Sequence, residues 1–309
     1  MGRTACTTYT NSPDQISPAW EPTHRSGEPI VGRLEGKVAL ITGAARGQGR
    51  NHAIRLAEEG ADIIAIDICA EIPSAWHSLG TEADLDETVN AVEKLDRRIV
   101  ARKADVRDRD ALQSAVAEGV AELGRLDIVS VNAGIISIAP TIELSVEEWR
   151  DVIDVNLTGA FNTAAVTVPH ILEGGRGGAV VFTSSGAGLA PVPNLAHYTA
   201  SKHGIIGLMK TLALELAPTG IRVNAICPTN VDTPMIVNDK VLKLFMPDNE
   251  HPTRADAEAE GSNHRSLNAI PVPWVEASDI SGALLYLASD DARYVTGIAL
   301  PVDAGFLLK

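Results

Sequence analysis

Residues 37–67, KVALITGAARGQGRNHAIRLAEEGADIIAID, contain a strand, a helix and a second strand in direct succession. Residues 37–42 and 61–67 are short apolar runs, and residues 50–60 between them have apolar positions at helical spacing and end at a glycine. Strands without strict polar alternation are typical of a parallel sheet that helices cover on both faces. This stretch therefore predicts a βαβ unit.

The same alternation of strands and helices continues along the chain. Strand-like runs recur at 98–106, 126–134, 177–185, 221–228 and 295–303, and helical patterns lie at 110–124, at 147–168, around Tyr198 and at 278–289. Repeated strand–helix order predicts a doubly wound parallel sheet of about seven strands with helices on both faces. The sequence shows no repeat and no second core, so we expect one α/β domain.

Three segments fall outside this alternation. Residues 1–33 are rich in Thr, Ser, Pro and Gly, which predicts a flexible N-terminal extension before a domain at 34–309. Residues 69–85 form an insertion after the second strand, and residues 235–273 separate the sixth strand from the last helix. Both could be disordered, but the amphipathic run MIVNDKVLKLFM favours a partly helical lid for 235–273.

Composition restricts the class of partner. The formal net charge is −14, which argues against nucleic acid and anionic membranes as partners and favours a small molecule. The three cysteines are scattered, which excludes CxxC metal spacing and a disulfide framework and suits a reducing cytoplasm. No apolar run has the length of a signal peptide or a membrane helix, so we expect a cytoplasmic protein.

A glycine-rich turn follows the first strand. Gly43, Gly47 and Gly49 in TGAARGQG stand where the chain must turn into a helix. Glycines there permit a tight turn and a close approach of phosphate oxygens to the N–H groups of the helix start. The spacing is GxxxGxG rather than the commoner GxGxxG, so the loop alone could equally be a structural turn.

An acidic residue completes the nucleotide-binding pattern. Asp67 ends the second strand, close to the offset at which a carboxylate binds an adenosine ribose in Rossmann-type folds. A carboxylate would repel a 2′-phosphate, which favours NAD over NADP. Arg46 beside the turn argues mildly for NADP, because a guanidinium could pair with that phosphate. We give Asp67 the greater weight.

Tyr198 and Lys202 lie four residues apart in HYTASKHG, so a helix would place phenol and ammonium on one face. A nearby ammonium lowers the pKa of a phenol and equips it to transfer protons. YxxxK also occurs by chance on solvated helices, so the pair needs support from the rest of the chain.

Six motifs together resemble the short-chain dehydrogenase/reductase family over roughly residues 35–305. They are TGAARGQG, the ADV at 104–106, the NAG at 132–134, Asn156 in DVNLTG, the serine pair at 184 and 185, and YTASK. The resemblance implies a single-domain Rossmann-type fold. It also implies a catalytic set of Asn156, Ser185, Tyr198 and Lys202, in which Tyr198 transfers the substrate proton, Ser185 holds the substrate oxygen, Lys202 lowers the Tyr198 pKa and binds ribose, and Asn156 holds a water.

The resemblance also implies a set of cofactor contacts for NAD. Besides Tyr198 and Lys202, these residues are Gly43, Ala45, Arg46, Gly47, Gln48, Gly49, Asp67, Ile68, Asp105, Val106, Asn132, Ala133, Gly134, Pro228, Thr229, Val231 and Thr233. Two departures from the family pattern affect the contact details: Pro228 is followed by Thr229 where the family usually has Gly, and Val131 replaces the first Asn of NNAG. No metal is implied.

Within the family, the sequence is similar to the carveol-dehydrogenase-like branch, which carries an insertion at 69–85, holds NAD tightly and passes electrons to mycofactocin. This implies oxidation of a secondary, apolar, terpenoid-like alcohol to its ketone, and the family commonly forms homotetramers. The apolar lid residues suit such a substrate, but also an interface or core: Met235, Ile236, Val237, Leu242, Leu244, Phe245 and Met246. The alternatives are a conventional NAD(P)H-exchanging ketone reductase and a non-catalytic NAD-binding protein.

Overall fold

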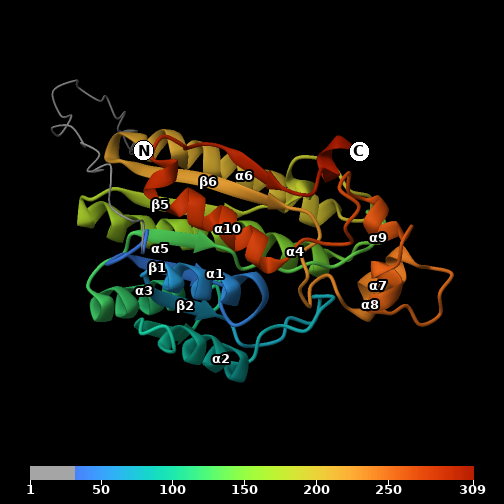
Figure 1. Ribbon diagram of the computed structural model, residues 1–309, viewed down its shortest axis with the longest axis horizontal. Helices are drawn as coiled ribbons and strands as arrows, with labels where there is room; N and C mark the ends of the chain where they lie inside the picture. Colours follow the sequence, from blue (N-terminus) through green and yellow to red (C-terminus); the bar gives the residue numbers. More distant parts are fainter. Residues whose placement is uncertain (1–31) are drawn as a thin grey trace, which may run out of the picture. The chain divides into compact units, whose positions relative to one another are not determined.

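The computed structural model describes residues 32–309, so the predicted N-terminal extension lies almost entirely outside the described residues. Seven parallel strands form one sheet in the order β3-β2-β1-β4-β5-β6-β7 (Figure 1). The chain runs outward from β1 to β3 and then returns past β1 to build the other half from β4 to β7. The predicted doubly wound α/β fold is confirmed.

The helices and strands have the following bounds. The strands are β1 Val38–Thr42, β2 Asp62–Asp67, β3 Ile99–Lys103, β4 Ile128–Val131, β5 Gly178–Thr183, β6 Ile221–Pro228 and β7 Ala299–Val302. The α-helices are α1 Gly47–Glu58, α2 Glu82–Glu93, α3 Arg109–Leu123, α4 Val146–Ile153, α5 Gly159–Gly174, α6 Ala196–Leu216, α7 Asp239–Phe245, α8 Arg254–Glu258, α9 Asn263–Ser266 and α10 Ala277–Ala288.

Helices cover both faces of the sheet, and alternate strand residues point to opposite layers. In β1, Leu40 packs in the core beneath α3, α5 and α6, whereas its neighbour Ile41 packs in the core beneath α1 and α10. Both side chains are fully buried. Because the central strands bury both faces, they form continuous apolar runs in the sequence, whereas the edge strands β3 and β7 are only partly buried.

Helix α2 was not among the predicted elements. It begins at Glu82, after Thr81 accepts a hydrogen bond from the Asp84 backbone and Asp84 accepts one from the Thr81 backbone. This reciprocal cap fixes the start of the helix. Residues 82–85 of the insertion therefore belong to α2, and its irregular part ends at Gly80.

The long helical pattern at 147–168 forms three consecutive elements. Helix α4 passes into a π-helical turn, η2 Asp154–Thr158, and then into α5. Single π turns within a helix are frequent at functional sites, because they re-aim a side chain. Here the turn carries Asn156, one of the predicted catalytic residues.

Residues 235–273 contain the three short helices α7, α8 and α9, which lie together beyond the carboxyl ends of the strands (Figure 1). Asn238, Thr253 and Ser262 cap them by accepting hydrogen bonds from backbone N–H groups in the first turn. We call this region the lid segment.

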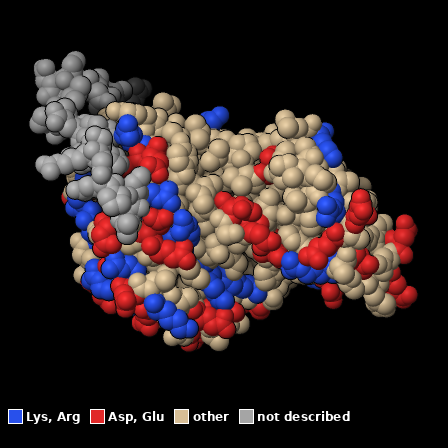
Figure 2. Space-filling view, in the orientation of Figure 1, with Lys and Arg blue, Asp and Glu red and all other residues tan. Residues whose placement is uncertain are grey.

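Charge is unevenly distributed over the surface. On the face in Figure 2, acidic and basic side chains crowd the lower part, over α1 and α2, while the upper part towards β6 and α6 is mostly uncharged. Within residues 32–309, no helix has both the length and the apolar character needed to cross a bilayer.

Candidate active site

The phosphate loop is shaped by glycines that admit no side chain. A Cβ on Gly49 would lie 1.9 Å from the Gly43 carbonyl oxygen, and Gly43 itself has a left-handed φ of 69°. Helix α1 starts at Gly47, and the Arg46 side chain at the N-cap position accepts no hydrogen bond from it. The first backbone N–H groups of the helix therefore face the loop without a capping side chain. This arrangement suits an anionic diphosphate.

Asp67 ends β2 beside this loop and is only 8% exposed. One carboxylate oxygen accepts the Ala45 N–H at 3.0 Å, and the other accepts the Cys69 N–H at 2.9 Å. Cys69 has a left-handed φ of 46° and begins the insertion. The carboxylate is therefore fixed by the loop on one side and by the insertion on the other.

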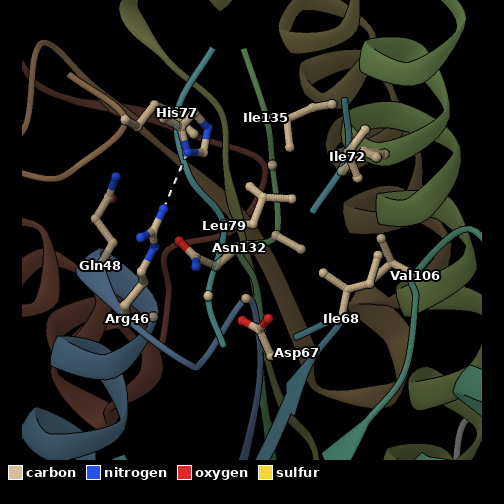
Figure 3. A pocket seen from close by; sticks show the side chains of 18 of the residues that line it. Arg46, Gln48, Asp67, Ile68, Ile72, His77, Leu79, Val106, Asn132 and Ile135 are labelled. Carbon is tan, nitrogen blue, oxygen red and sulfur yellow. Dashed lines mark hydrogen bonds between the residues drawn. The ribbon is translucent and has the colours of Figure 1, made fainter. Parts of the chain in front are cut away.

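A first cavity of about 140 Å³ lies over the carboxyl ends of β1, β2 and β4 (Figure 3). Most of the predicted cofactor contacts line it: Gly43, Arg46, Gly47, Gln48, Gly49, Asp67, Ile68, Asp105, Val106, Asn132, Ala133, Gly134 and Thr233. Ala45 does not line it and acts through its bond to Asp67. We call this the nucleotide cavity.

Two of its lining residues are held by their own networks. Asn132 donates to the Thr42 carbonyl at 3.1 Å and accepts from the Thr183 hydroxyl at 3.2 Å, so it joins the ends of β1 and β5. Asp105 accepts three hydrogen bonds from the Arg107 guanidinium, at 3.1, 2.9 and 2.7 Å. Both residues are thus held in the cavity wall by bonds within the chain.

The insertion supplies lining residues that the sequence did not single out. Ile72, His77, Leu79 and Gly80 line the nucleotide cavity, and Ile72 and Leu79 are buried in the main core. Two hydrogen bonds anchor the insertion to the rest of the chain, Trp76 N to Ile136 O and Ser74 Oγ to Asp151. A third, from Leu79 N to Glu71, lies within the insertion. It is a packed cover rather than a loose surface loop.

The residues around the loop fit a nucleotide diphosphate. Gln48 Oε1 and His77 Nε2 are buried at the cavity without a hydrogen-bond partner among residues 32–309. Buried polar atoms are normally paired, so two such atoms beside a glycine cradle indicate a polar ligand. The predicted NAD therefore suits the groups present here.

A second cavity of about 190 Å³ adjoins the first, and the two share Gln48, Asn132, Gly134, Thr233 and Met235 among their lining residues. Ser185, Tyr198 and Lys202 line the second cavity, together with Pro228, Thr229 and Val231. Lys202 is the one charged residue among the lining residues in the described part of the chain. We call this the substrate cavity.

Tyr198 meets its neighbours in the wall of the substrate cavity. Its side chain hydrogen-bonds that of Ser185, whereas Ser184 is turned away and donates to the Lys202 carbonyl at 3.0 Å. The Lys202 ammonium lies 5.4 Å from the centre of the Tyr198 ring and donates to the Thr183 carbonyl at 2.8 Å. Ser185, Tyr198 and Lys202 are thus gathered at one point.

The electrostatics differ from the expectation that Lys202 lowers the Tyr198 pKa. Burial raises the pKa of Tyr198 to about 12, and the hydrogen bond with Ser185 acts in the opposite direction. Burial also lowers the pKa of Lys202 to about 8. Desolvation therefore outweighs charge pairing here, because Lys202 is bound to a backbone carbonyl rather than to the phenol.

Asn156 is fully buried and its amide is paired on both sides. Its Oδ1 accepts the Ile135 N–H at 2.8 Å, and its Nδ2 donates to the Ile135 carbonyl at 3.0 Å and to Ser201 Oγ at 3.2 Å. A Cβ on Gly134 would lie 3.3 Å from Asn156 Oδ1 and 3.6 Å from Lys202 Nζ. Both polar groups therefore lie beside Gly134.

The lid residues divide between two roles. Met235, Ile236, Leu244 and Phe245 line the substrate cavity, with Val241 beside them. In contrast, Val237, Leu242 and Met246 pack in a separate core with Ala257 and Trp274. The C-terminal Phe306, which the sequence did not indicate, also lines the cavity and packs against Gly186.

Comparisons with known proteins agree with this arrangement. The family model for short chain dehydrogenases matches residues 37–241. The chain is 54% identical to (-)-trans-carveol dehydrogenase of Rhodococcus erythropolis over 281 residues, which is 90% of this chain and 100% of that protein.

Two solved structures with bound NAD are similar as well. Carveol dehydrogenase from Mycobacterium avium superposes with a TM-score of 0.88 at 54% identity, covering 90% of this chain and 100% of that one. A short chain dehydrogenase from Mycobacterium paratuberculosis has a TM-score of 0.82 at 44% identity, with the same coverage. With the family model matching well over half of the chain, this protein belongs to the short chain dehydrogenase family.

Proposed function

We propose that this enzyme is an NAD-dependent alcohol dehydrogenase that interconverts an apolar secondary alcohol and its ketone. The observation that carries the proposal is the position of Tyr198 and Ser185, which line an apolar cavity where it adjoins the nucleotide cavity. A non-catalytic NAD-binding protein would not need a phenol and a hydroxyl at this junction.

The chain's own residues support a proton-transfer role in this reaction. Bound NAD would supply the acceptor for the hydride from the carbinol carbon. The Tyr198 oxygen takes the hydroxyl proton, so no free alkoxide forms, and Ser185 holds the substrate oxygen. Lys202 binds the nicotinamide ribose, and Asn156 holds a water that relays the proton outward.

The substrate class follows from the walls of the substrate cavity. Apolar lid residues such as Met235, Ile236 and Phe245 suit a compact hydrocarbon, and a negatively charged substrate would find only Lys202 as a charged lining residue. The 54% identity to (-)-trans-carveol dehydrogenase supports a terpenoid alcohol of carveol type.

The direct test is turnover with carveol. Purified enzyme is mixed with the alcohol and an artificial electron acceptor, with and without added NAD, and ketone is quantified by gas chromatography. We expect ketone from wild type and at least about a hundredfold less from Tyr198→Phe. Equal ketone formation by both proteins would contradict the proposal.

We further propose that NAD is held tightly and reoxidised through mycofactocin. The anchored insertion supports this, because NAD release would wait for the cover to open. The test is to purify the enzyme without added cofactor, denature it and identify the released nucleotide by mass spectrometry. Stoichiometric NAD that resists exchange with labelled NAD supports the proposal; an empty site with rapid exchange supports the conventional ketone reductase.

We also propose that the protein is a homotetramer in the cytoplasm. Exposed apolar side chains on the helices and on the last strand region support an interface: Trp149 on α4, Phe161 on α5, Tyr286 on α10, and Ile298 just before β7. Native mass spectrometry gives the oligomeric state directly, and a monomer at micromolar concentration would refute the tetramer.

A further inference from the structure

The insertion lies directly over the carboxylate that is expected to receive the adenosine ribose. Gly80 is buried, and a Cβ there would lie 2.6 Å from the Ala45 Cβ and 3.4 Å from Asp67 Oδ1. The backbone of the insertion is therefore in contact distance of both the phosphate loop and Asp67. Little room remains at this point for a further group on the ribose.

The insertion also holds Arg46, a cation that could favour such a group. Arg46 Nη1 donates to Ser78 Oγ at 3.2 Å, and Nη2 lies 3.5 Å from His77 Nδ1. Figure 3 shows the Arg46 side chain running from the start of α1 towards His77 rather than across to Asp67. Of these two contacts, the one to Ser78 holds Arg46, because His77 Nδ1 donates to the Ser78 carbonyl at 2.9 Å and so cannot also accept from the guanidinium.

The charges around Arg46 reinforce this arrangement. The carboxylates of Asp84, Glu71 and Asp67 all interact electrostatically with its guanidinium, and Glu71 belongs to the insertion. The neighbouring Arg50 is also engaged, since it donates to the Ala45 and Asp84 carbonyls and pairs with Glu87. A phosphate beside Asp67 would therefore meet carboxylates and two arginines that already have partners.

We propose that the insertion is a second determinant of NAD selectivity, which excludes the 2′-phosphate of NADP by lying against Asp67 through Gly80 and by holding Arg46 through Ser78. This inference rests on the proposed use of NAD and goes beyond it. Asp67 repels the 2′-phosphate of NADP. The insertion leaves no room for this phosphate and keeps Arg46 from pairing with it. Loss of Asp67 alone then leaves much of the discrimination in place.

The test compares variants in which Arg46 loses its partners in the insertion, both in the presence and in the absence of the Asp67 carboxylate. The proteins are wild type, Asp67→Ala, the pair His77→Ala with Ser78→Ala, and the triple variant. Each is unfolded to strip any bound nucleotide, refolded with equimolar NAD and NADP, freed of unbound nucleotide and denatured again, and the two nucleotides are quantified by mass spectrometry. Dissociation constants from tryptophan fluorescence titration give a second readout, and thermal unfolding checks that each protein is folded.

We expect the triple variant to raise the NADP-to-NAD ratio by about tenfold or more beyond the product of the two separate effects, since a charge-assisted hydrogen bond from a freed Arg46 has that size. Adding Arg46→Ala to the triple variant should abolish this gain. Ser78→Ala without His77→Ala removes the hydrogen bond to Arg46 but leaves the His77 ring beside the guanidinium. It should raise the NADP-to-NAD ratio by a smaller factor.

Two outcomes overturn the inference: Asp67→Ala alone reaching the ratio of the triple variant, or an unchanged ratio when His77 and Ser78 are replaced in the Asp67→Ala background. Neither outcome contradicts the proposed function as long as the wild-type protein binds NAD. Wild type that captures neither nucleotide contradicts the proposed function itself.

Discussion

The nucleotide cavity and the substrate cavity are built in different ways. Short motifs at the ends of neighbouring strands line most of the nucleotide cavity, around Gly43, Asp67, Asp105 and Asn132. The substrate cavity instead draws on segments far apart in the chain, from Ile136 to Phe306. The first is fixed by the sheet, whereas the second depends on how the lid segment packs. Chemistry and cofactor can thus persist in a family while the substrate changes.

The sharpest test of the junction between the cavities is Tyr198→Phe. We expect alcohol oxidation to fall by about 10²–10⁴-fold while bound NAD is unchanged, because the substitution removes only the proton-transferring oxygen. Turnover is measured by ketone formation and NAD content by mass spectrometry. Tyr286→Phe on α10 is the matched control and should retain wild-type turnover. A Tyr198→Phe variant within tenfold of wild type would exclude the proposed proton transfer.

The pH dependence of the reaction rate tells whether burial or pairing with the Lys202 ammonium sets the pKa of Tyr198. Oxidation needs the phenolate, and with a pKa of about 12 its fraction is small at pH 7 and rises with pH. We expect the oxidation rate to increase about tenfold per pH unit between pH 7 and 9, while ketone reduction, which uses the protonated phenol, stays flat. Initial rates in both directions check this. A plateau in oxidation above pH 7 would mean that Lys202 controls the phenol after all.

The substrate cavity alone should respond to Phe245→Ala. The ring lines this cavity and no part of the nucleotide cavity. We expect kcat/KM for carveol to fall by about 10–100-fold, mainly through KM, with NAD content unchanged, because lost apolar contact weakens substrate binding. Leu214→Ala on α6, where the side chain is 82% exposed, is the control. If NAD content falls together with kcat/KM, the two cavities are not independent.

The smallest expected effect concerns the rigidity of the nucleotide cavity. Gly49→Ala places a Cβ against the Gly43 carbonyl, so the loop must shift, and we expect a stability loss of about 1–3 kcal/mol. Gly207→Ala in α6 has open space around it and should instead stabilise by about 0.5–1 kcal/mol. Chemical denaturation of both variants measures the difference. Equal stabilities would show that the loop is not tightly packed.

Much of the fold could be predicted from the sequence, because strands buried on both faces produce apolar runs that are easy to recognise. Helix α2 was missed, although Thr81 and Asp84 have the spacing of a capping box. The insertion hid this signal, since its irregular residues lead directly into the helix without an apolar pattern.

The candidate site was predictable where spacing alone fixes proximity. Tyr198 and Lys202 share a helix face, yet the partner of Lys202 Nζ is the Thr183 carbonyl, which only the packing of α6 on β5 brings within reach. Phe306 and Gly80 could not be predicted for the same reason. Both residues contact residues that are distant in the sequence, and such contacts cannot be recognised from a local sequence pattern.

The packing of the Trp76 ring against the lid segment has a consequence for the exchange of parts between relatives. Trp76 belongs to the insertion, but its ring packs in the cluster of Ile136, Val241 and Phe245, and Lys240 on α7 lies 5.6 Å from its centre. A chimera that receives a foreign lid segment alone would lose the surface on which Trp76 rests. The two segments must therefore be inherited, or engineered, as one module.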